Sequence, residues 1–463
     1  MYKLFLAIFI LFLTSCDVSQ LNNPYSESES DLSILYSSFS ERPKHLDPAV
    51  SYSANENVFI GQIYEPPFQY HYLKRPYQLE PLTAVTMPKI HYFNKQGDEI
   101  KGGELGKIAY TDYIIEIKSG IKYQPHPAFI ESNRQLTQTQ IDKINVLSDF
   151  KQLGSRELIA KDYVLQIKRL AHPKIQSPIA GVMKNYIEGF TEYSKQVAKM
   201  DRMAIKTIPM TGVTVLDRYR YKIRIKGKYP QFKFWLAMPF FAPMPWEADA
   251  FYQQKGLSDK NITLDWFPVG TGPYFLSENN PNQRMVLTKN PNYHDDFYPA
   301  EGELGDREQG LLDDAGKSIP FIDKVVYILE KENIPYWNKF LQGYFDASGI
   351  SSNSFDQAIQ FNGGGSAQLT EAMKDQGIQL QTAVTPTIYY LGFNMLDSVV
   401  GGDADQARKL RQAISIALDY EEYISIFMNG RGVAPQGMLP PGMYGYQEGE
   451  AGINPYVYNW VNK

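Results

Sequence analysis

The sequence predicts a mixed α/β protein with more than one lobe, and three observations support this. Strand-like and helix-like segments alternate irregularly along the chain, separated by many Pro and Gly residues. No internal repeat is present. The 463 residues also exceed the length, about 250–300 residues, at which one hydrophobic core stops growing. We therefore expect two or three domains with separate cores.

The N-terminus predicts a signal peptide over residues 1–15, followed by lipidation. Lys3 precedes an apolar run from Leu4 to Leu13, which is too short for the ~20 residues of a membrane-spanning helix but suits a signal peptide. Leu13-Thr14-Ser15-Cys16 then resembles the lipobox of bacterial lipoproteins. The alternative is a transmembrane anchor with an incidental cysteine. We expect an exported protein held on a lipid bilayer through acylated Cys16.

The composition of the remaining chain restricts its partners. Residues 16–31 are polar, acidic and Ser-rich, which predicts a flexible tether. Cys16 is the only cysteine, so the lipidated protein has no thiol left for a disulfide or a zinc site. The formal net charge of −5 gives no electrostatic reason to expect nucleic acid as a partner.

The clearest strand is predicted over residues 218–226. Tyr or Ile alternates there with Arg or Lys, which is typical of a half-buried strand. We expect Tyr219 and Ile223 to be buried, and Arg220 and Lys222 to face solvent or a polar cleft.

The clearest helix is predicted over residues 405–428, where apolar residues recur at helical spacing. Asp403 or Asp405 is suited to cap its start, and Gly430 lies just past its end.

The chain contains no recognisable catalytic or metal motif. Its six histidines form no HxxxH pair, and neither a G-x-S-x-G nor an S-x-x-K motif occurs. The acidic segment from His294 to Asp314 is a weak calcium candidate, but it lacks the spacing of an EF-hand loop and is more typical of a solvated surface loop. We expect no enzyme activity, cofactor or metal, with a secreted hydrolase as the alternative.

Several short motifs follow one another in a specific order between roughly residues 40 and 445. They are His45-Leu46-Asp47-Pro48, Ile63-Tyr64-Glu65-Pro66-Pro67, residues 117–123, 160–164 and 168–170, Pro268-Val269-Gly270-Thr271-Gly272-Pro273-Tyr274, Asn290-Pro291-Asn292-Tyr293, and residues 343–346, 390–394, 410–413, 417–419 and 430–441. Together they resemble the peptide and nickel class of bacterial ABC-importer substrate-binding proteins, which includes the oligopeptide- and dipeptide-binding proteins. Pro66 is a departure, because the family has Gly there.

The resemblance implies a two-lobed periplasmic-binding-protein fold, of the class with an extra domain in lobe I, that closes on an extended oligopeptide. We expect lobe I over residues 32–275, with an inserted subdomain at roughly 55–185, and lobe II over residues 276–463. The turn at residues 270–274 is expected to be architectural, with glycines that relieve backbone strain. The implied partners are an oligopeptide and ABC permease subunits, and the protein itself is expected to be a monomer.

The resemblance also implies ligand-binding positions. Tyr52, Ser53 and Ala54 fall where the family makes main-chain contacts to the peptide. Ile179 falls where the oligopeptide binders carry a ligand-contacting Tyr, which is a departure. Tyr389 and Tyr390 lie near the strand that lines the cleft in the other lobe. Core or hinge packing is the alternative for each residue.

The family's Trp-x-x-Asp-Tyr-x-x-Pro segment, whose Asp anchors the peptide amino terminus, has no counterpart before Lys463. Lobe II is therefore expected to be incomplete, because the sequence is a fragment or because the gene is interrupted. Asp17 resembles an inner-membrane retention signal, which predicts the periplasmic side of the inner membrane. The alternatives are another solute (a cell-wall peptide, a sugar or a nickel chelate) and a non-transporting envelope interaction protein.

Overall fold

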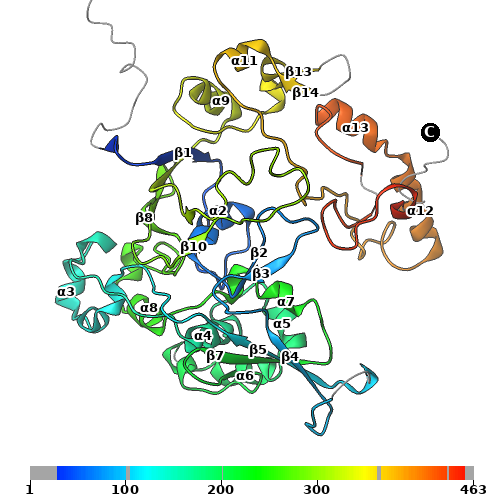
Figure 1. The fold of residues 1–463 in the computed structure, drawn as a ribbon. Helices are drawn as coiled ribbons and strands as arrows, with labels where there is room; N and C mark the ends of the chain where they lie inside the picture. Colours follow the sequence, from blue (N-terminus) through cyan, green and yellow to red (C-terminus); the bar gives the residue numbers. More distant parts are fainter. Residues whose placement is uncertain (1–28, 101–104, 201, 362–366, 435–436, 454–463) are drawn as a thin grey trace, which may run out of the picture. The chain divides into compact units, whose positions relative to one another are not determined.

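The computed structural model describes residues 29–100, 105–200, 202–361, 367–434 and 437–453. Cys16, the predicted signal peptide and most of the predicted tether lie outside these residues. The chain divides into two compact units. Figure 1 shows its helices and strands. The first holds the described residues of Met1–Tyr72, Leu79–Glu332 and Lys339–Ala347, and the second those of Leu73–Gln78, Asn333–Asn338 and Ser348–Lys463. The predicted lobe boundaries stay predictions.

The secondary structure is mixed α and β, as predicted. The strands of the described residues are β1 (Ile34–Phe39), β2 (Phe68–Tyr70), β3 (Leu79–Pro81), β4 (Lys89–Phe93), β5 (Tyr110–Glu116), β6 (Val213–Val215), β7 (Arg220–Lys226), β8 (Tyr274–Asn280), β9 (Arg284–Lys289), β10 (Asp296–Phe297), β11 (Ser318–Ile319), β12 (Lys324–Leu329), β13 (Ile359–Phe361) and β14 (Ala367–Leu369). The α-helices are α2 (Ala54–Ile63), α3 (Gln138–Asp142), α4 (Ala160–Leu170), α5 (Ala180–Tyr186), α6 (Phe190–Val197), α7 (Phe232–Trp235), α8 (Trp246–Tyr252), α9 (Asn333–Leu341), α10 (Phe355–Ala358), α11 (Glu371–Asp375), α12 (Asp405–Ala417) and α13 (Tyr420–Phe427).

One sheet of the first unit joins distant parts of the sequence. Its strand order is β1-β12-β9-β8. β1 pairs in parallel with β12, with Ile34 opposite Lys324, whereas β12 with β9 and β9 with β8 are antiparallel. Helix α2 packs against this sheet, where the ring of Phe59 meets that of Tyr327 at 5.0 Å between centroids. The carboxyl ends of β1 and β12 therefore lie at the same edge of the sheet.

The second sheet of this unit contains the strand predicted from alternation. Its order is β4-β5-β7-β6, and every pair is antiparallel. Within β7, Ile223 is buried, Arg220 is exposed and Lys222 is half-buried at 3.3 Å from the carboxylate of Asp112, so the predicted facing is confirmed for these residues. Tyr219 precedes the strand and is only half-buried, which corrects its predicted burial.

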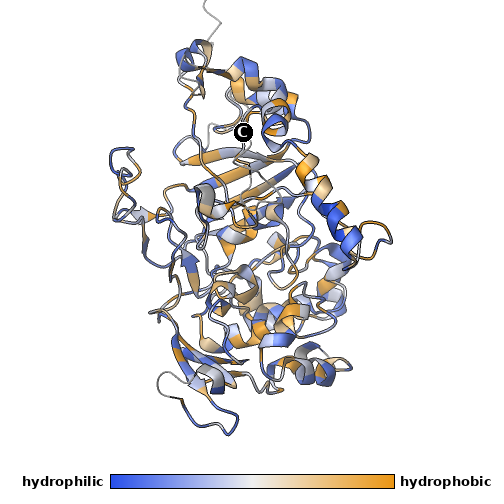
Figure 2. Cartoon of the chain, turned by 90° about the vertical axis from the view of Figure 1, so that its right-hand side faces the viewer, coloured by the Kyte–Doolittle hydropathy of each residue, from blue (hydrophilic) through white to orange (hydrophobic). Residues whose placement is uncertain are grey.

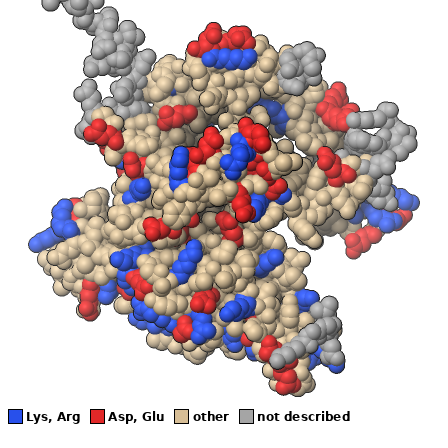
Figure 3. Space-filling view, viewed as in Figure 1, with Lys and Arg blue, Asp and Glu red and all other residues tan. Residues whose placement is uncertain are grey.

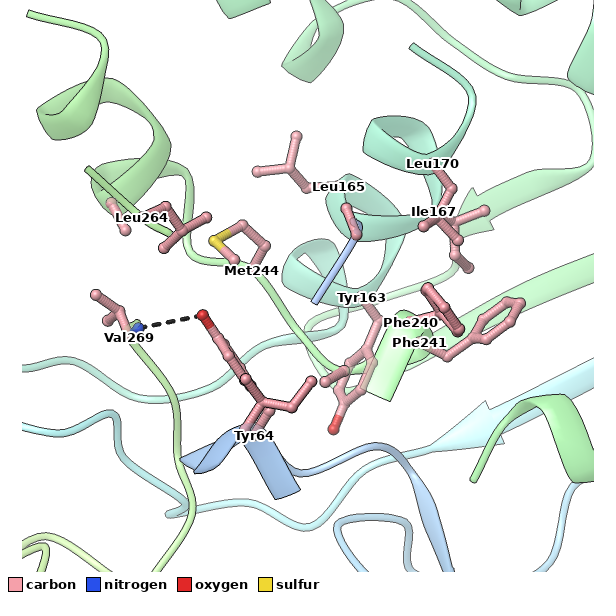
Figure 4. Packing of buried hydrophobic residues seen from close by; sticks show 14 of the residues in the cluster. Tyr64, Tyr163, Leu165, Ile167, Leu170, Phe240, Phe241, Met244, Leu264 and Val269 are labelled. Atoms are coloured by element: carbon pink, nitrogen blue, oxygen red, sulfur yellow. Dashed lines mark hydrogen bonds between the residues drawn. The ribbon is translucent and has the colours of Figure 1, made fainter. Parts of the chain in front are cut away.

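Helix α4 covers the β6–β7 side of this sheet. The ring of Tyr163 stacks on that of Tyr221, with centroids 5.1 Å apart and planes within 8°. Figure 4 shows the neighbouring core, in which the N–H of Val269 donates to the hydroxyl of Tyr64 at 3.3 Å. Figure 2 shows hydrophobic and hydrophilic residues mixed along most helices and strands, as expected of elements with one buried face.

A buried ion pair joins the segment before α2 to helix α4. Arg169 is fully buried and donates hydrogen bonds from both terminal nitrogens to the carboxylate of Asp47, at 3.0 and 2.5 Å. Burial raises the pKa of Asp47, but the charge of Arg169 outweighs burial and holds this pKa below its ordinary value. Asp47 also accepts the N–H of Ala49 at 2.9 Å. The Leu-Asp-Pro motif therefore fixes the approach to α2.

The Gly-Thr-Gly-Pro-Tyr turn packs against the C-terminal end of α2. A Cβ atom on Gly270 would lie 1.9 Å from the carbonyl oxygen of Ile63, and one on Gly272 would lie 2.6 Å from that of Gln62. Neither glycine has a positive φ, so the expected relief of backbone strain is wrong. These positions require glycine because the helix backbone lies too close for a side chain.

Residues 405–428 form two helices instead of the single predicted one. The carboxylate of Asp419 accepts the N–H of Glu422 at 2.9 Å and so caps the start of α13. This local bond competes with continuation of α12, because it satisfies the backbone of a new helix. Neither predicted aspartate caps α12, whose N-cap is Ala404. Gly430 follows α13 with a φ of +72°.

Replacing Asp47 by Asn leaves Arg169 buried without its main counterion. We expect the free energy of unfolding to fall by about 3–5 kcal/mol, because the buried guanidinium then keeps only the carboxylate of Asp249, at 3.6 Å, as a counterion and loses its two hydrogen bonds to a charged partner. Urea denaturation measures this loss. Glu278→Gln is the matched control, since it breaks an exposed pair with Arg284 and should cost less than about 1 kcal/mol. Equal losses in the two variants would contradict this role.

Gly270→Ala places a methyl group against the Ile63 carbonyl, so the turn or α2 must move. We expect a loss of roughly 1–3 kcal/mol in the free energy of unfolding. Gly181→Ala in α5 is the control, because a Cβ there meets no neighbour within 4 Å and alanine favours a helix. If thermal denaturation finds the two variants equally stable, close approach is not the reason for glycine.

Candidate functional site

The segment that leads into α2 is organised by one buried carboxylate. Glu56 lies in the first turn of α2 and is 1% exposed. Its two oxygens accept hydrogen bonds from the chain before the helix, through main-chain N–H groups and one hydroxyl. The donors are the N–H groups of Lys44, His45, Tyr52 and Ser53 and the hydroxyl of Ser51, at 2.8–3.1 Å. The residues before the helix are therefore fixed to its first turn.

These bonds depend on the ionised form of Glu56. Burial raises the pKa of its carboxyl, but the hydrogen bonds from Ser53, Ser51 and the adjacent main chain outweigh burial and hold the pKa below its ordinary value. A group with a lowered pKa stabilises the fold above its unfolded pKa, about 4.3 for Glu, and this contribution is lost as the pH falls through the folded pKa. At neutral pH the carboxylate therefore keeps its hydrogen bonds.

Tyr52, Ser53 and Ala54 lie at the start of α2. Ser53 is the N-cap of this helix and Ala54 its first residue. The Tyr52 side chain is 74% exposed, and the two residues after it are also exposed. Within the described part of the chain, the C=O of Tyr52 and the N–H of Ala54 make no hydrogen bond. Two main-chain groups without a hydrogen bond thus lie on exposed residues, in a segment that the bonds to Glu56 hold in place.

The other predicted ligand-binding residues lie in different surroundings. Ile179 is the N-cap of α5, is 2% exposed and belongs to the hydrophobic core, so its side chain is closed to a ligand in this structure. Tyr389 and Tyr390 belong to the second unit and are 82% and 85% exposed. Core packing, the alternative to ligand binding, therefore holds for Ile179. It does not hold for Tyr389 and Tyr390.

One aromatic ring that was not predicted as part of the site lies beside Tyr52. The ring centroids of Phe240 and Tyr52 are 6.3 Å apart. A second aromatic pair lies in the same unit. Tyr70, the last residue of β2, stacks with Phe234 of α7 at 6.5 Å between centroids. The aromatic run at residues 232–241 is visible in the sequence, but such a run is equally typical of a core, and Phe240 itself is buried. The sequence alone therefore does not show whether these aromatic residues belong to a binding site or to the core.

His294 supports the segment that follows α2. Its Nε2 lies 2.8 Å from Oε1 of Glu65, and both side chains are largely buried, at 11% and 3% exposure. The predicted solvated loop is therefore wrong for His294 itself. Burial lowers the pKa of His294, but the hydrogen bond and charge of Glu65 outweigh burial and raise the pKa above its ordinary value.

The described residues contain no group of three or more His, Cys, Asp or Glu residues placed to hold an ion. None of their helices has both the length and the hydropathy needed to cross a membrane.

Figure 3 shows acidic and basic side chains interspersed on the visible face, without a large surface of one sign.

Because folding raises the pKa of His294, its pairing with Glu65 should make the protein less stable at alkaline pH. The contribution is fully present below the unfolded pKa of about 6.5 and is lost as the pH rises through the folded pKa. Urea denaturation between about pH 6 and pH 9 should show this slope, and His294→Gln should remove most of it. His91→Gln is the control, because His91 forms an exposed pair with Glu99. A slope unchanged in His294→Gln would disprove the assignment.

Comparison with known proteins identifies the family. The model described as bacterial extracellular solute-binding proteins, family 5 middle, matches residues 154–459. The periplasmic oligopeptide-binding protein OppA of Salmonella typhimurium is 30% identical over 138 residues, which cover 29% of this chain and 23% of OppA.

Solved structures share the fold at low sequence identity. OppA of Burkholderia pseudomallei has a TM-score of 0.55 at 18% identity, with 89% of this chain and 61% of that chain covered. DppA of Helicobacter pylori, in complex with the peptide STSA, has a TM-score of 0.56 at 16% identity, with 94% and 65% covered. The murein tripeptide-binding protein MppA of Escherichia coli has a TM-score of 0.56 at 16% identity, with 90% and 62% covered.

This chain therefore spans less than two thirds of each of these structures. They confirm the predicted α/β periplasmic-binding-protein fold. The family model covers more than half of the chain, and its description is one of binding proteins rather than enzymes. The protein belongs to the bacterial extracellular solute-binding proteins of family 5.

Proposed function

We propose that this protein is the lipid-anchored solute-binding component of an ABC importer. It captures extended oligopeptides between two lobes and delivers them to permease subunits in the inner membrane. Family membership supports solute binding, and the peptide assignment rests on the C=O of Tyr52 and the N–H of Ala54, which lie on exposed residues and make no hydrogen bond within the described part of the chain. The proposed lobes are those predicted from the sequence, residues 32–275 and 276–463.

An extended peptide adds to this segment as a further strand. Tyr52 and Ala54 are two residues apart, so in an extended chain the C=O of the first and the N–H of the second point to the same side. One ligand residue bonds both groups, as in a parallel ladder. Main-chain recognition of this kind tolerates many ligand sequences. Since Glu56 already fixes the segment, binding does not have to order it.

Side chains complete the proposed site. The exposed ring of Tyr52 contacts a ligand side chain next to Phe240. Tyr389 and Tyr390 contact the ligand from the second lobe, and Ile179 supports the site from the core. Acylated Cys16 anchors the protein to the bilayer, and Asp17 retains it on the periplasmic side of the inner membrane, beside its permease. It acts as a monomer, without a cofactor.

Ala54→Pro tests the main-chain contact directly, because it removes one N–H group and leaves the fold intact. Proline is favoured at the first position of a helix, and Ser53 has the extended conformation, φ −87° and ψ 150°, that a following proline requires. We expect peptide affinity to fall about tenfold, the value of one hydrogen bond near 1.4 kcal/mol, with an unchanged melting temperature. Calorimetric titration with a mixed tetrapeptide pool measures the affinity.

Ala54→Ser is the matched control, since it keeps the N–H group at the same position. A peptide affinity of Ala54→Pro equal to that of Ala54→Ser would reject the main-chain contact. Binding of a sugar or a nickel chelate by the parent chain, with no response to peptides or to a murein tripeptide, would reject the oligopeptide assignment. Turnover of ester or peptide substrates that is lost on changing one Ser, Asp or Glu would reject the binding function itself.

A further inference from the structure

A pocket of about 590 Å³ lies in the first unit, at the edge where the parallel strands β1 and β12 end. One wall is the segment from Ser40 to Lys44, which follows β1. The other walls are Lys331 after β12, Asn282 in the turn between β8 and β9, and Trp266. The crevice outside the carboxyl ends of parallel strands is a common place for ligands, and this volume lies within the usual range for small-molecule sites.

The charges of this pocket have one predominant sign. Arg42, Lys44 and Lys331 line it, against the single carboxylate of Glu41. Among the described residues, no ion pair involves Lys44 or Lys331, and Glu330, the acid next to Lys331, pairs with Lys339 instead. Three cations around one cavity in a chain of net charge −5 raise the local concentration of an anion.

The cationic wall is held in place by hydrogen bonds. Nη1 of Arg42 donates to the side-chain oxygen of Asn282 at 2.6 Å, and the carbonyl of Arg42 accepts from the amide of Asn55 at 3.3 Å. The N–H of Lys44 donates to Glu56 at 3.1 Å. A ligand therefore meets fixed main chain on this side, and only long side chains must be ordered on binding.

The rest of the lining includes apolar side chains, those of Trp266, Pro43 and Pro281. Trp266 is half-buried, and its carbonyl accepts the amide of Asn279 at 2.6 Å, which fixes its main chain at the pocket. An indole that lines the same pocket as a guanidinium and two ammonium groups suits a ligand with an apolar ring and a negative charge, because the ring stacks while the charge pairs.

We propose that this pocket binds a small organic anion with a flat apolar body. Its carboxylate pairs with Arg42 and Lys331, and its ring lies against Trp266. The inference goes beyond the proposed function, because it concerns a ligand other than the transported peptide and none of its contacts involves Tyr52 or Ala54.

The test is calorimetric titration of the purified chain with phenylacetate. We expect saturable binding, at least about tenfold tighter than that of the uncharged analogue phenylacetamide, since the charge supplies much of the recognition. Arg42→Gln combined with Lys331→Gln should weaken phenylacetate binding about tenfold or more, and Trp266→Leu should weaken both probes. Lys255→Gln, at an exposed lysine outside the pocket, is the control and should bind as the parent does.

Each other outcome overturns the proposal. Absence of saturable phenylacetate binding would reject the anion site. Equal affinities for phenylacetate and phenylacetamide would also reject it. Displacement of phenylacetate by an equal concentration of inorganic phosphate would show a plain cluster of cations without selection for an apolar body. Peptide titration of the double variant separates this site from the peptide site, because peptide affinity should be unchanged there.

Discussion

The buried carboxylate of Glu56 is the interaction on which the proposed binding segment depends. Its hydrogen bonds fix two stretches of chain before α2, at Lys44–His45 and at Ser51–Ser53. The negative charge also lies in the first turn of the helix, where the helix dipole favours it. Without this acceptor, four main-chain N–H groups would lose their partner, and the segment would have to be ordered by the ligand itself. The segment proposed to bind the ligand is thus held in place before any ligand arrives.

The helix that carries this edge is fixed at both ends. Before α2, the Asp47–Arg169 pair joins its approach to α4 through the core. At its other end, Gly270 and Gly272 let the Gly-Thr-Gly-Pro-Tyr turn lie against the last carbonyls of the helix. The motifs that carry the family resemblance therefore stabilise the framework, whereas Tyr52 to Ala54 lie between them on the surface.

The sequence predicted what depends on local periodicity, and it could not predict what depends on distant partners. The alternation in β7 correctly predicted that Ile223 is buried. Alternate residues of a strand point to opposite faces, and the apolar face packs against the core. Asp47 and Arg169 are 122 residues apart, so no local pattern reveals their pairing. The apolar spacing of residues 405–428 continues across Asp419, and only the capping bond shows that a new helix begins. Tyr52, Ser53 and Ala54 were predicted from the family resemblance, whereas the contact of Tyr52 with the distant Phe240 is formed only by the fold.

Amide hydrogen exchange of the chain with and without a saturating peptide tests the central claim most directly. If the peptide adds as a strand at the start of α2, the N–H of Ala54, which has no partner among the described residues, should exchange much more slowly in the complex. The N–H groups of Tyr52 and Ser53 should already be protected without peptide, because Glu56 accepts them. Peptide-induced protection elsewhere, with exchange at Ala54 unchanged, would contradict the account.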